Sequence, residues 1–204
     1  MNIQTTTQPR FTQPHGLLGD DNLYPESHDT DMGESSFHQK LIWYLFGALE
    51  SFFLNNSNVL VAANMNLYYE EGSVTKYYTP DIMVSFGTAK GDRQVYKLWE
   101  EGVFPQVIFE VASGRTWKND IGEKAEFYDA SGVEEYYLID AERKYLPLPL
   151  MAYRRQEARL QYVPLQQDRI FSPLLNLDIV DTGKSFRLFD RETREFLQAI
   201  LPDE

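Results

Sequence analysis

The segment QVIFEVAS at 106–113 constrains the fold most, because it is an apolar run of strand length that a single acid, Glu110, interrupts. Such a run indicates a central strand that is covered on both faces of its sheet. Residues 119–131 follow with helical spacing and end at Gly132, and EEYYLID at 134–140 has the composition of the next strand. Strand, helix and strand of these lengths form a βαβ crossover, so the sequence predicts a mixed sheet with a parallel pair.

The segment before this unit begins with another helix. Ser35 and Ser36 offer a hydroxyl cap before FHQKLIWYLFGALESFF, in which apolar residues recur every three or four positions. This helix is apolar nearly all round, so we expect it to pack on more than one side. We expect one or two strands at 59–72, a short strand at 77–87 and an extended piece at 95–102.

The C-terminal part has a different pattern. Short antiparallel strands are expected at 147–155, 159–165 and 186–190, and a closing helix at 191–200. The predicted fold class is therefore α/β, in the α+β sense: a mixed central sheet flanked by helices, with an antiparallel C-terminal extension.

The two ends of the chain differ in composition. Residues 1–33 are rich in Thr, Gln, Pro, Gly and Asp and predict a flexible N-terminal arm, whereas residues 34–204 predict a single domain. The first residues contain no apolar signal-peptide core. The longest apolar run, at 41–49, is shorter than the ~20 residues of a membrane span. We expect a soluble, cytoplasmic protein that does not enter membranes.

Charge and cysteine content exclude some classes of protein. The chain has no cysteine, which rules out disulfides and thiolate metal sites. Its formal net charge of −12 argues against a simple DNA-binding module, because DNA is itself strongly negative. The charge counts less against a metal-dependent enzyme, since bound divalent ions cancel part of the local negative charge.

Two acids stand beside apolar strands. Pro80 pushes Thr79 into an extended conformation, so we expect Asp81 at a strand start or beside a turn, where an aspartate is usually a turn residue. Glu110 lies within its strand, where a buried carboxylate needs a cation, a metal ion or access to solvent. The alternative for Glu110 is an exposed position on the other face of the sheet.

A lysine follows on the predicted helix. Lys124 shares one face with Ile121, Ala125 and Tyr128, and that face should pack on the sheet. We therefore expect Lys124 to point inward or along the rim, although a lysine that snorkels at the edge of the apolar stripe has the same spacing.

Two more acids precede or begin predicted helices. Asp120 and Glu123 match a capping box, so we interpret Asp120 as an N-cap and leave it out of the chemistry. Glu34 comes just before the first helix and is the candidate for a third catalytic acid, although acids near helix N-termini are also favoured by the helix dipole.

Two carboxylates and a lysine suit metal-dependent hydrolysis. Asp81 and Glu110 can hold Mg²⁺ or Mn²⁺ through hard oxygen ligands. The metal then activates a water molecule and neutralises charge on a phosphodiester, and a lysine such as Lys124 orients that water or stabilises the developing charge.

The arrangement resembles a nuclease superfamily. Asp81 in TPDIMV and Glu110 in QVIFEVAS are similar to the paired acids of the PD-(D/E)XK nucleases. Most members carry a lysine two residues after the Glu, where this chain has Ala112. In this departure the chain is similar to the Uma-type restriction endonucleases, a family once classed as a domain of unknown function. Their pattern of E-V-x-S, D-x-x-x-K-x-x-x-Y and G-V-x-E-Y matches EVAS (110–113), DIGEKAEFY (120–128) and GVEEYYLID (132–140).

The resemblance extends from about Met32 to Asp190 and implies a restriction-endonuclease-like core. It implies an endonuclease that cleaves DNA with Mg²⁺ or Mn²⁺, with Asp81 and Glu110 as metal ligands. It also implies that Lys124 is the charge-stabilising residue, moved onto the helix, and that Glu34 is the acid such enzymes often draw from the first helix. For most of this family the activity is inferred from fold, so here it is an expectation.

The sequence gives little support for other kinds of functional site. His15 and His28 fall in the predicted arm and His38 opens the first helix, so a His-rich metal site is not expected. No glycine-rich phosphate loop and no G-x-S-x-G motif occur. The basic residues that form either a DNA-facing rim or ordinary solvated surface are Arg115, Lys118, Arg143, Lys144, Arg154 and Arg155.

A second hypothesis keeps the fold without the chemistry. The chain can be a non-catalytic interaction module, in a homodimer or with another protein. The charge of −12 and the alanine at position 112 motivate it.

Overall fold

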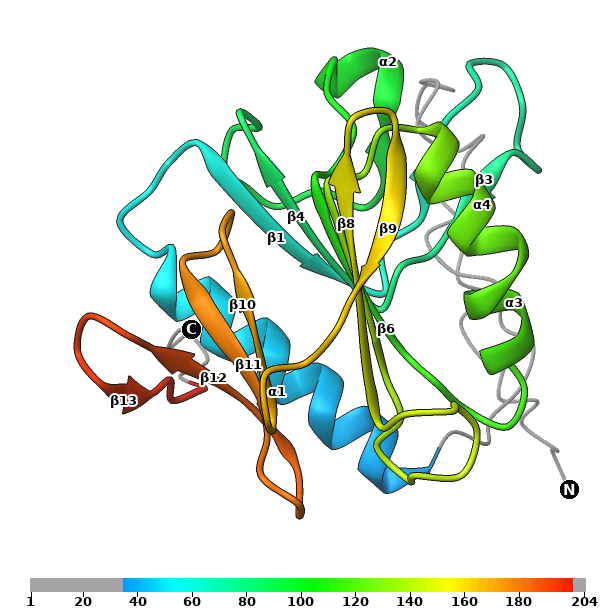
Figure 1. The fold of residues 1–204 in the computed structure, drawn as a ribbon. Helices are drawn as coiled ribbons and strands as arrows, with labels where there is room; N and C mark the ends of the chain where they lie inside the picture. Colours follow the sequence, from blue (N-terminus) through cyan, green and yellow to red (C-terminus); the bar gives the residue numbers. More distant parts are fainter. Residues whose placement is uncertain (1–34, 200–204) are drawn as a thin grey trace, which may run out of the picture.

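A computed structural model of the chain describes residues 35–199 (Figure 1). The predicted arm at 1–33 and the predicted acid Glu34 lie outside the described residues. A six-stranded sheet forms the centre of the fold. Its strands are, in spatial order, β1 (Val59–Ala63), β4 (Ile82–Phe86), β6 (Val107–Val111), β7 (Glu135–Ile139), β8 (Leu150–Gln156) and β9 (Arg159–Val163).

The strand at the centre of this sheet is the one that carries Glu110. All five residues of β6 are buried, and β6 runs parallel to β7 with Glu110 opposite Leu138. The other neighbouring pairs of the sheet are antiparallel. The predicted central strand, the βαβ crossover and the mixed sheet are confirmed.

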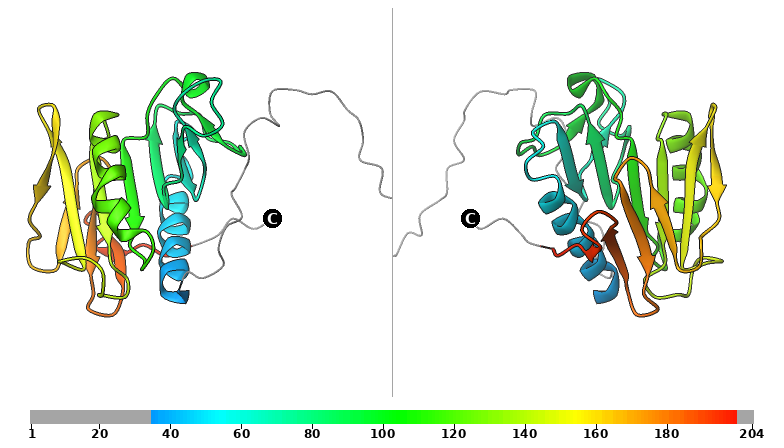
Figure 2. Two further views of the ribbon diagram at one scale, coloured as in Figure 1. Left: turned by 90° about the vertical axis from the view of Figure 1, so that its right-hand side faces the viewer. Right: turned by 60° about the vertical axis from the view of Figure 1, so that its left-hand side comes forward.

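One face of the central sheet is covered by the first helix and a second sheet. Helix α1 (Ser36–Phe52) has the predicted N-cap at Ser35, whose hydroxyl oxygen accepts the His38 N–H at 3.4 Å. Figure 2 shows α1, in blue, beside the C-terminal sheet, in orange to red. Apolar side chains of α1, β6 and the C-terminal sheet form one core. The strands of this second sheet are β10 (Arg169–Ser172), β11 (Leu177–Asp181), β12 (Phe186–Asp190) and β13 (Glu195–Phe196).

The other face packs against the helical segment after β6 and a small sheet. Tyr128 of the helix after β6 shares a second core with Ile108, Tyr136 and Tyr96. The small sheet is made of β3 (Tyr77–Tyr78), β2 (Leu67–Tyr68) and β5 (Tyr96–Lys97). A short helix, α2 (Leu98–Glu101), follows β5, so the predicted extended piece at 95–102 is only partly correct.

The predicted helix at 119–131 is two helices with a break. They are α3 (Trp117–Ile121) and α4 (Glu123–Ala130), and Gly122 separates them. A Cβ at Gly122 would lie 2.9 Å from the carbonyl oxygen of Lys118, so only glycine permits this close approach. The break turns Ile121 to the surface, where it is 41% exposed, and its predicted inward orientation is wrong.

The predicted helix at 191–200 is also wrong. Asp190 accepts the backbone N–H of Glu192 and the hydroxyl of Thr193, which closes a turn, and Arg194 has a left-handed φ of 62°. The chain then pairs with β12 as β13. Within residues 35–199 no helix is long and apolar enough to cross a membrane.

Candidate active site

The antiparallel pairing of β4 and β6 brings two predicted acids together. Ile82 lies opposite Phe109, so Asp81, just before β4, sits beside Glu110 near the end of β6. The Val111 N–H donates to Asp81 Oδ2 at 2.6 Å, and the Asp81 N–H donates to Glu110 Oε2 at 3.4 Å. Each acid is therefore fixed by the backbone next to the other.

Strand alternation sends the Glu110 side chain toward α4. Phe109 belongs to the core on the α1 side, whereas Glu110 meets Lys124 and Tyr128. The Lys124 ammonium donates to Glu110 Oε2 at 2.9 Å, and the Tyr128 hydroxyl donates to Glu110 Oε1 at 2.8 Å. The Glu110 residue is fully buried, so both oxygens depend on these partners.

Asp120 joins the same cluster, although the sequence interpretation assigned it to a helix cap. Its Oδ1 lies 3.1 Å from Lys124 Nζ, and the residue is fully buried. The N-cap assignment is wrong because α3 starts at Trp117 and Asp120 is inside it. Glu123 does not complete a capping box either, since its carboxylate accepts the Tyr78 hydroxyl at 2.9 Å. The i, i+4 spacing of Asp120 and Lys124 was the available signal.

Burial and mutual repulsion raise the pKa values of the acids Glu110 and Asp120 in this cluster. Burial raises the pKa of Glu110 to about 8, against the lowering effect of Lys124 and with a further rise from Asp81 and Asp120. Burial also raises the pKa of Asp120. Burial alone would lower the pKa of Lys124, but the carboxylates of Glu110, Asp120 and Asp81 raise it above its ordinary value. The cluster therefore gathers three carboxyl groups around one ammonium, and Glu110 keeps its proton up to about pH 8.

His38 is a neighbour that the sequence analysis set aside. It is 2% exposed, and its Nε2 lies 2.7 Å from the carbonyl oxygen of Val111, which makes Nε2 the donor. The same nitrogen is 3.7 Å from Asp81 Oδ2. His38 thus ties α1 to the end of β6 beside both acids. Its place on the buried stripe with Leu41 and Leu45 was a weak signal of this inward orientation.

The donor chemistry of the cluster suits a hard divalent cation. Asp81, Glu110 and Asp120 offer carboxylate oxygens, and neither buried oxygen of Asp120 accepts a hydrogen bond of good geometry from the described residues. Within residues 35–199, however, no three acidic or histidine side chains are already gathered as a ligand set. The residues therefore fit Mg²⁺ or Mn²⁺ in type and charge, and binding would require the side chains to adjust.

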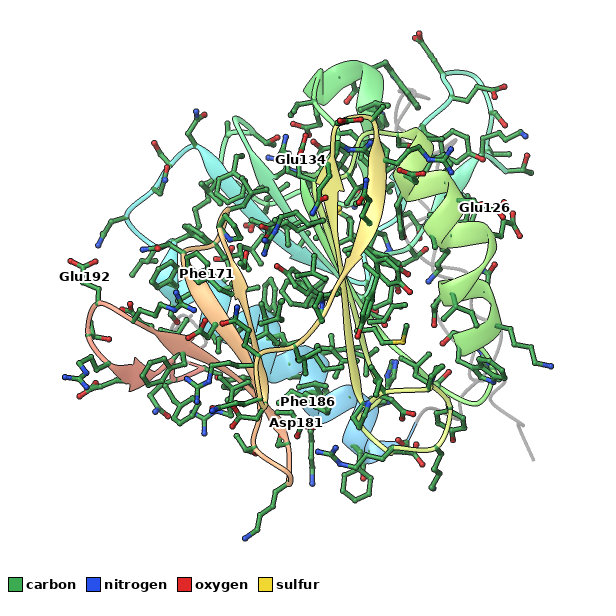
Figure 3. All side chains as sticks on the ribbon, viewed as in Figure 1. Glu126, Glu134, Phe171, Asp181, Phe186 and Glu192 are labelled. Carbon is green, nitrogen blue, oxygen red and sulfur yellow. The ribbon has the colours of Figure 1, made fainter. Side chains whose placement is uncertain are left out.

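The basic residues proposed for a rim have unequal roles. Arg154 donates to the Phe171 carbonyl, and Arg155 donates to the carbonyls of Val133, Ala158 and Asp129, so both brace the fold. Arg143 donates to Asp181, and Lys144 pairs with Glu142. Lys118 is exposed and lies over the Trp117 ring. Figure 3 shows the side chains on the ribbon, with Phe171 and Asp181 labelled.

Comparison with known proteins identifies the family. A family model described as "Uma2: Putative restriction endonuclease" matches residues 30–180. The chain belongs to this family. The match contains Asp81, Glu110, Asp120 and Lys124, and it confirms the resemblance to Uma-type endonucleases. No curated protein matches the chain.

A solved structure supports the same fold. The crystal structure of "a putative nuclease belonging to DUF820" from Anabaena variabilis ATCC 29413 is similar, with a TM-score of 0.50. The two share 12% sequence identity over 70% of this chain and 75% of that chain. At this identity the likeness concerns the fold alone, and it confirms the predicted nuclease-like α/β core.

Proposed function

We propose that this protein is a metal-dependent endonuclease that hydrolyses phosphodiester bonds of DNA. The observation that carries the proposal is one buried cluster, in which the acids Asp81, Glu110 and Asp120 surround the Lys124 ammonium. Membership of a family described as restriction endonucleases supports DNA as the substrate.

Asp81 and Glu110 would hold Mg²⁺ or Mn²⁺, and Asp120 is a further oxygen donor within reach of Lys124. When bound, such an ion lowers the pKa of an attacking water and neutralises charge on the phosphodiester. Hydrolysis forms one P–O bond to the water oxygen and breaks the P–O bond to a sugar oxygen.

The chain's own residues orient the reacting groups. Lys124 is held by two carboxylates, and its ammonium would stabilise the charge that develops on a phosphate bound beside them. The Tyr128 hydroxyl fixes one oxygen of Glu110, and His38 fixes the Val111 carbonyl beside it. Preorganisation of this kind reduces the reorganisation that the reaction requires.

Cleavage of DNA with Mg²⁺ or Mn²⁺ tests the proposal. We expect Asp81→Ala and Glu110→Ala to lose activity by about 100-fold or more, as for other electrostatic groups that act in the transition state. Asp81→Asn is the second variant, because its amide oxygen can still accept the Val111 N–H. Asp92→Asn, at an exposed loop position, is the matched control. Equal cleavage by all variants would overturn the assignment.

A non-catalytic module is the second candidate. It is favoured by the Lys124 ammonium, which already pairs with Glu110 and Asp120, and by Ala112 at the usual lysine position. In that case DNA stays intact with either ion, and the partner is a protein, such as a second copy of the chain. The homodimer and the cytoplasmic location stay predictions.

A further inference from the structure

A groove lies between the N-terminal half of α1, the loop after β7 and the turn between β11 and β12. Its volume is about 210 Å³, and its lining includes Phe37, Lys40, Leu41, Ala141, Lys184 and Phe186. Figure 3 labels Phe186 and Asp181 at this lower end of the fold, next to α1.

The groove and the candidate active site share helix α1. His38, whose imidazole reaches the Val111 carbonyl, stands on α1 between Phe37 and Lys40. Successive helical residues turn by about 100°, so Lys40 projects from the opposite side of α1 to His38. His38 is buried toward the acids, whereas Phe37 and Lys40 are exposed. The groove and the acids therefore lie on different sides of the N-terminal half of α1.

Charge distinguishes this groove from other hollows of the surface. Lys40 and Lys184 are exposed, and neither forms an ion pair with any residue from 35 to 199. Asp181 stands near the groove, but its carboxylate accepts the Arg143 guanidinium, which lowers the pKa of Asp181 and offsets its charge. The two lysines are thus available for an anionic ligand.

Two further hollows on the described surface have mixed charge. One is lined by Glu126 and Asp129 beside Arg155 and Arg159. The other is lined by Glu50 and Asp92 beside Lys90 and Arg93. Among these three hollows of the described chain, the groove with Lys40 and Lys184 alone has cations and no acid.

An aromatic ring stands at the rim of the groove. Phe37 is 65% exposed. The exposed ring offers a flat apolar face on which a planar ligand can stack. An exposed ring beside two cations is the arrangement that binds single-stranded nucleic acid, in which bases stack on aromatic side chains and lysines track the phosphates.

We propose that this groove binds a single-stranded segment of the polynucleotide substrate, with Lys40 and Lys184 on backbone phosphates and one base stacked on Phe37. The inference rests on the proposed function for its choice of nucleic acid as ligand. It deepens that function by naming single-stranded DNA, or an unpaired stretch of a duplex, as the substrate class. A fully paired duplex offers no unstacked base to the ring.

Fluorescence anisotropy with the full chain in EDTA tests the groove without cleavage. The probe is a fluorescein-labelled oligothymidylate of about 12 nucleotides, compared with a duplex of equal length. Each lysine that contacts a phosphate of a single strand contributes about −0.7 to the slope of log K against log salt concentration. We expect the Lys40→Gln/Lys184→Gln double variant to reduce the slope by about 1.4, and Phe37→Ala to weaken binding about five-fold or more. Lys76→Gln, an exposed lysine in the β2–β3 loop, should bind like the wild type.

The outcomes separate this inference from the proposed activity. Weaker binding by the groove variants supports the groove even if no DNA is cleaved with Mg²⁺ or Mn²⁺. Unchanged slope and affinity in the groove variants overturn it even if cleavage occurs. Preference for the duplex, or equal binding of a polyglutamate peptide, also overturns it, since the groove would then recognise double-stranded DNA or an acidic protein segment.

Discussion

The Lys124 ammonium lies 2.9 Å from Glu110 Oε2 and 3.1 Å from Asp120 Oδ1, so one cation compensates two buried carboxylates. Asp81, fixed beside Glu110 by two backbone hydrogen bonds, adds a third carboxyl group to the cluster, in which Glu110 has a pKa raised to about 8 by burial. Such a cluster is costly without additional positive charge, because desolvation disfavours every unpaired ion in it. A divalent ion, as in the proposed function, would supply that positive charge beside the end of the central strand.

Lys124→Met should destabilise the fold more at pH 9 than at pH 6. Burial raises the pKa of Glu110 to about 8, so Glu110 is protonated at pH 6 with or without the lysine. Above pH 8 the wild type can ionise Glu110 beside Lys124, whereas the variant must keep it protonated or bury an unpaired charge. At pH 9, one unit above the pKa of Glu110, this ionisation contributes about 1.4 kcal/mol, so we expect the loss of stability to be larger at pH 9 than at pH 6 by about that amount.

Urea unfolding in EDTA at the two pH values measures this difference. Lys118→Met, at an exposed position of α3, is the control and should change stability little at either pH. A loss for Lys124→Met that is the same at pH 6 and pH 9 would show that the lysine acts through packing rather than charge.

Gly122→Ala should destabilise the protein by about 1–3 kcal/mol, as other overpacked positions do. The added Cβ would lie 2.9 Å from the Lys118 carbonyl oxygen, and the break between α3 and α4 would have to shift. Gly114→Ala is the matched control, because its Cβ would meet Tyr145 at an ordinary 3.5 Å. The free energy of unfolding of both variants decides the matter. Equal effects would mean that the close approach at Gly122 is unimportant.

Part of the site could be predicted from sequence because its signals are local. Strand alternation placed Glu110 on one face of β6, and helical spacing placed Lys124 on the inward stripe, so their meeting followed from short-range patterns. Asp120 was missed because a capping acid and an i, i+4 ion-pair partner look alike in sequence. His38 was missed because its partner Val111 is 73 residues away and no local pattern connects them.

The same distinction explains the errors in the fold. The break at Gly122 depends on the backbone of Lys118, a contact that the periodicity of 119–131 does not reveal. The predicted C-terminal helix had good helix formers, but the Asp190 turn and pairing with β12 overrode that preference. Strands β10 and β11 were not predicted, although β12 beside them was.

Asp129 should contribute stability that disappears in acid. Burial alone would raise its pKa, but the Leu160 N–H and the Arg159 guanidinium hold the pKa of Asp129 below its ordinary value of 3.8. A lowered pKa means that the ionised form stabilises the fold above pH 3.8 and that this contribution is lost as pH falls through the lower folded value. We therefore expect Asp129→Asn to be less stable than the wild type at pH 6. The difference in free energy of unfolding between the two proteins should disappear on acidification.

The urea midpoints of the wild type and the variant, measured from pH 6 downward, test whether the difference in stability disappears. Asp168→Asn, at a more exposed aspartate that also pairs with an arginine, is the control and should give no such trend. If the urea midpoint of Asp129→Asn differs from that of the wild type by the same amount in strong acid as at pH 6, the proposed charge interaction is contradicted.

The central claim is that Asp81 and Glu110 still bind a divalent ion, and calorimetric titration with Mn²⁺ tests it most directly. Wild-type protein should give a saturable heat, Asp92→Asn should give the same heat, and Asp81→Asn should lose it while it keeps the Val111 hydrogen bond and the fold. A folded wild type that gives no heat, or an Asp81→Asn variant that binds Mn²⁺ like the wild type, would contradict the assignment of this cluster as a metal-dependent active site.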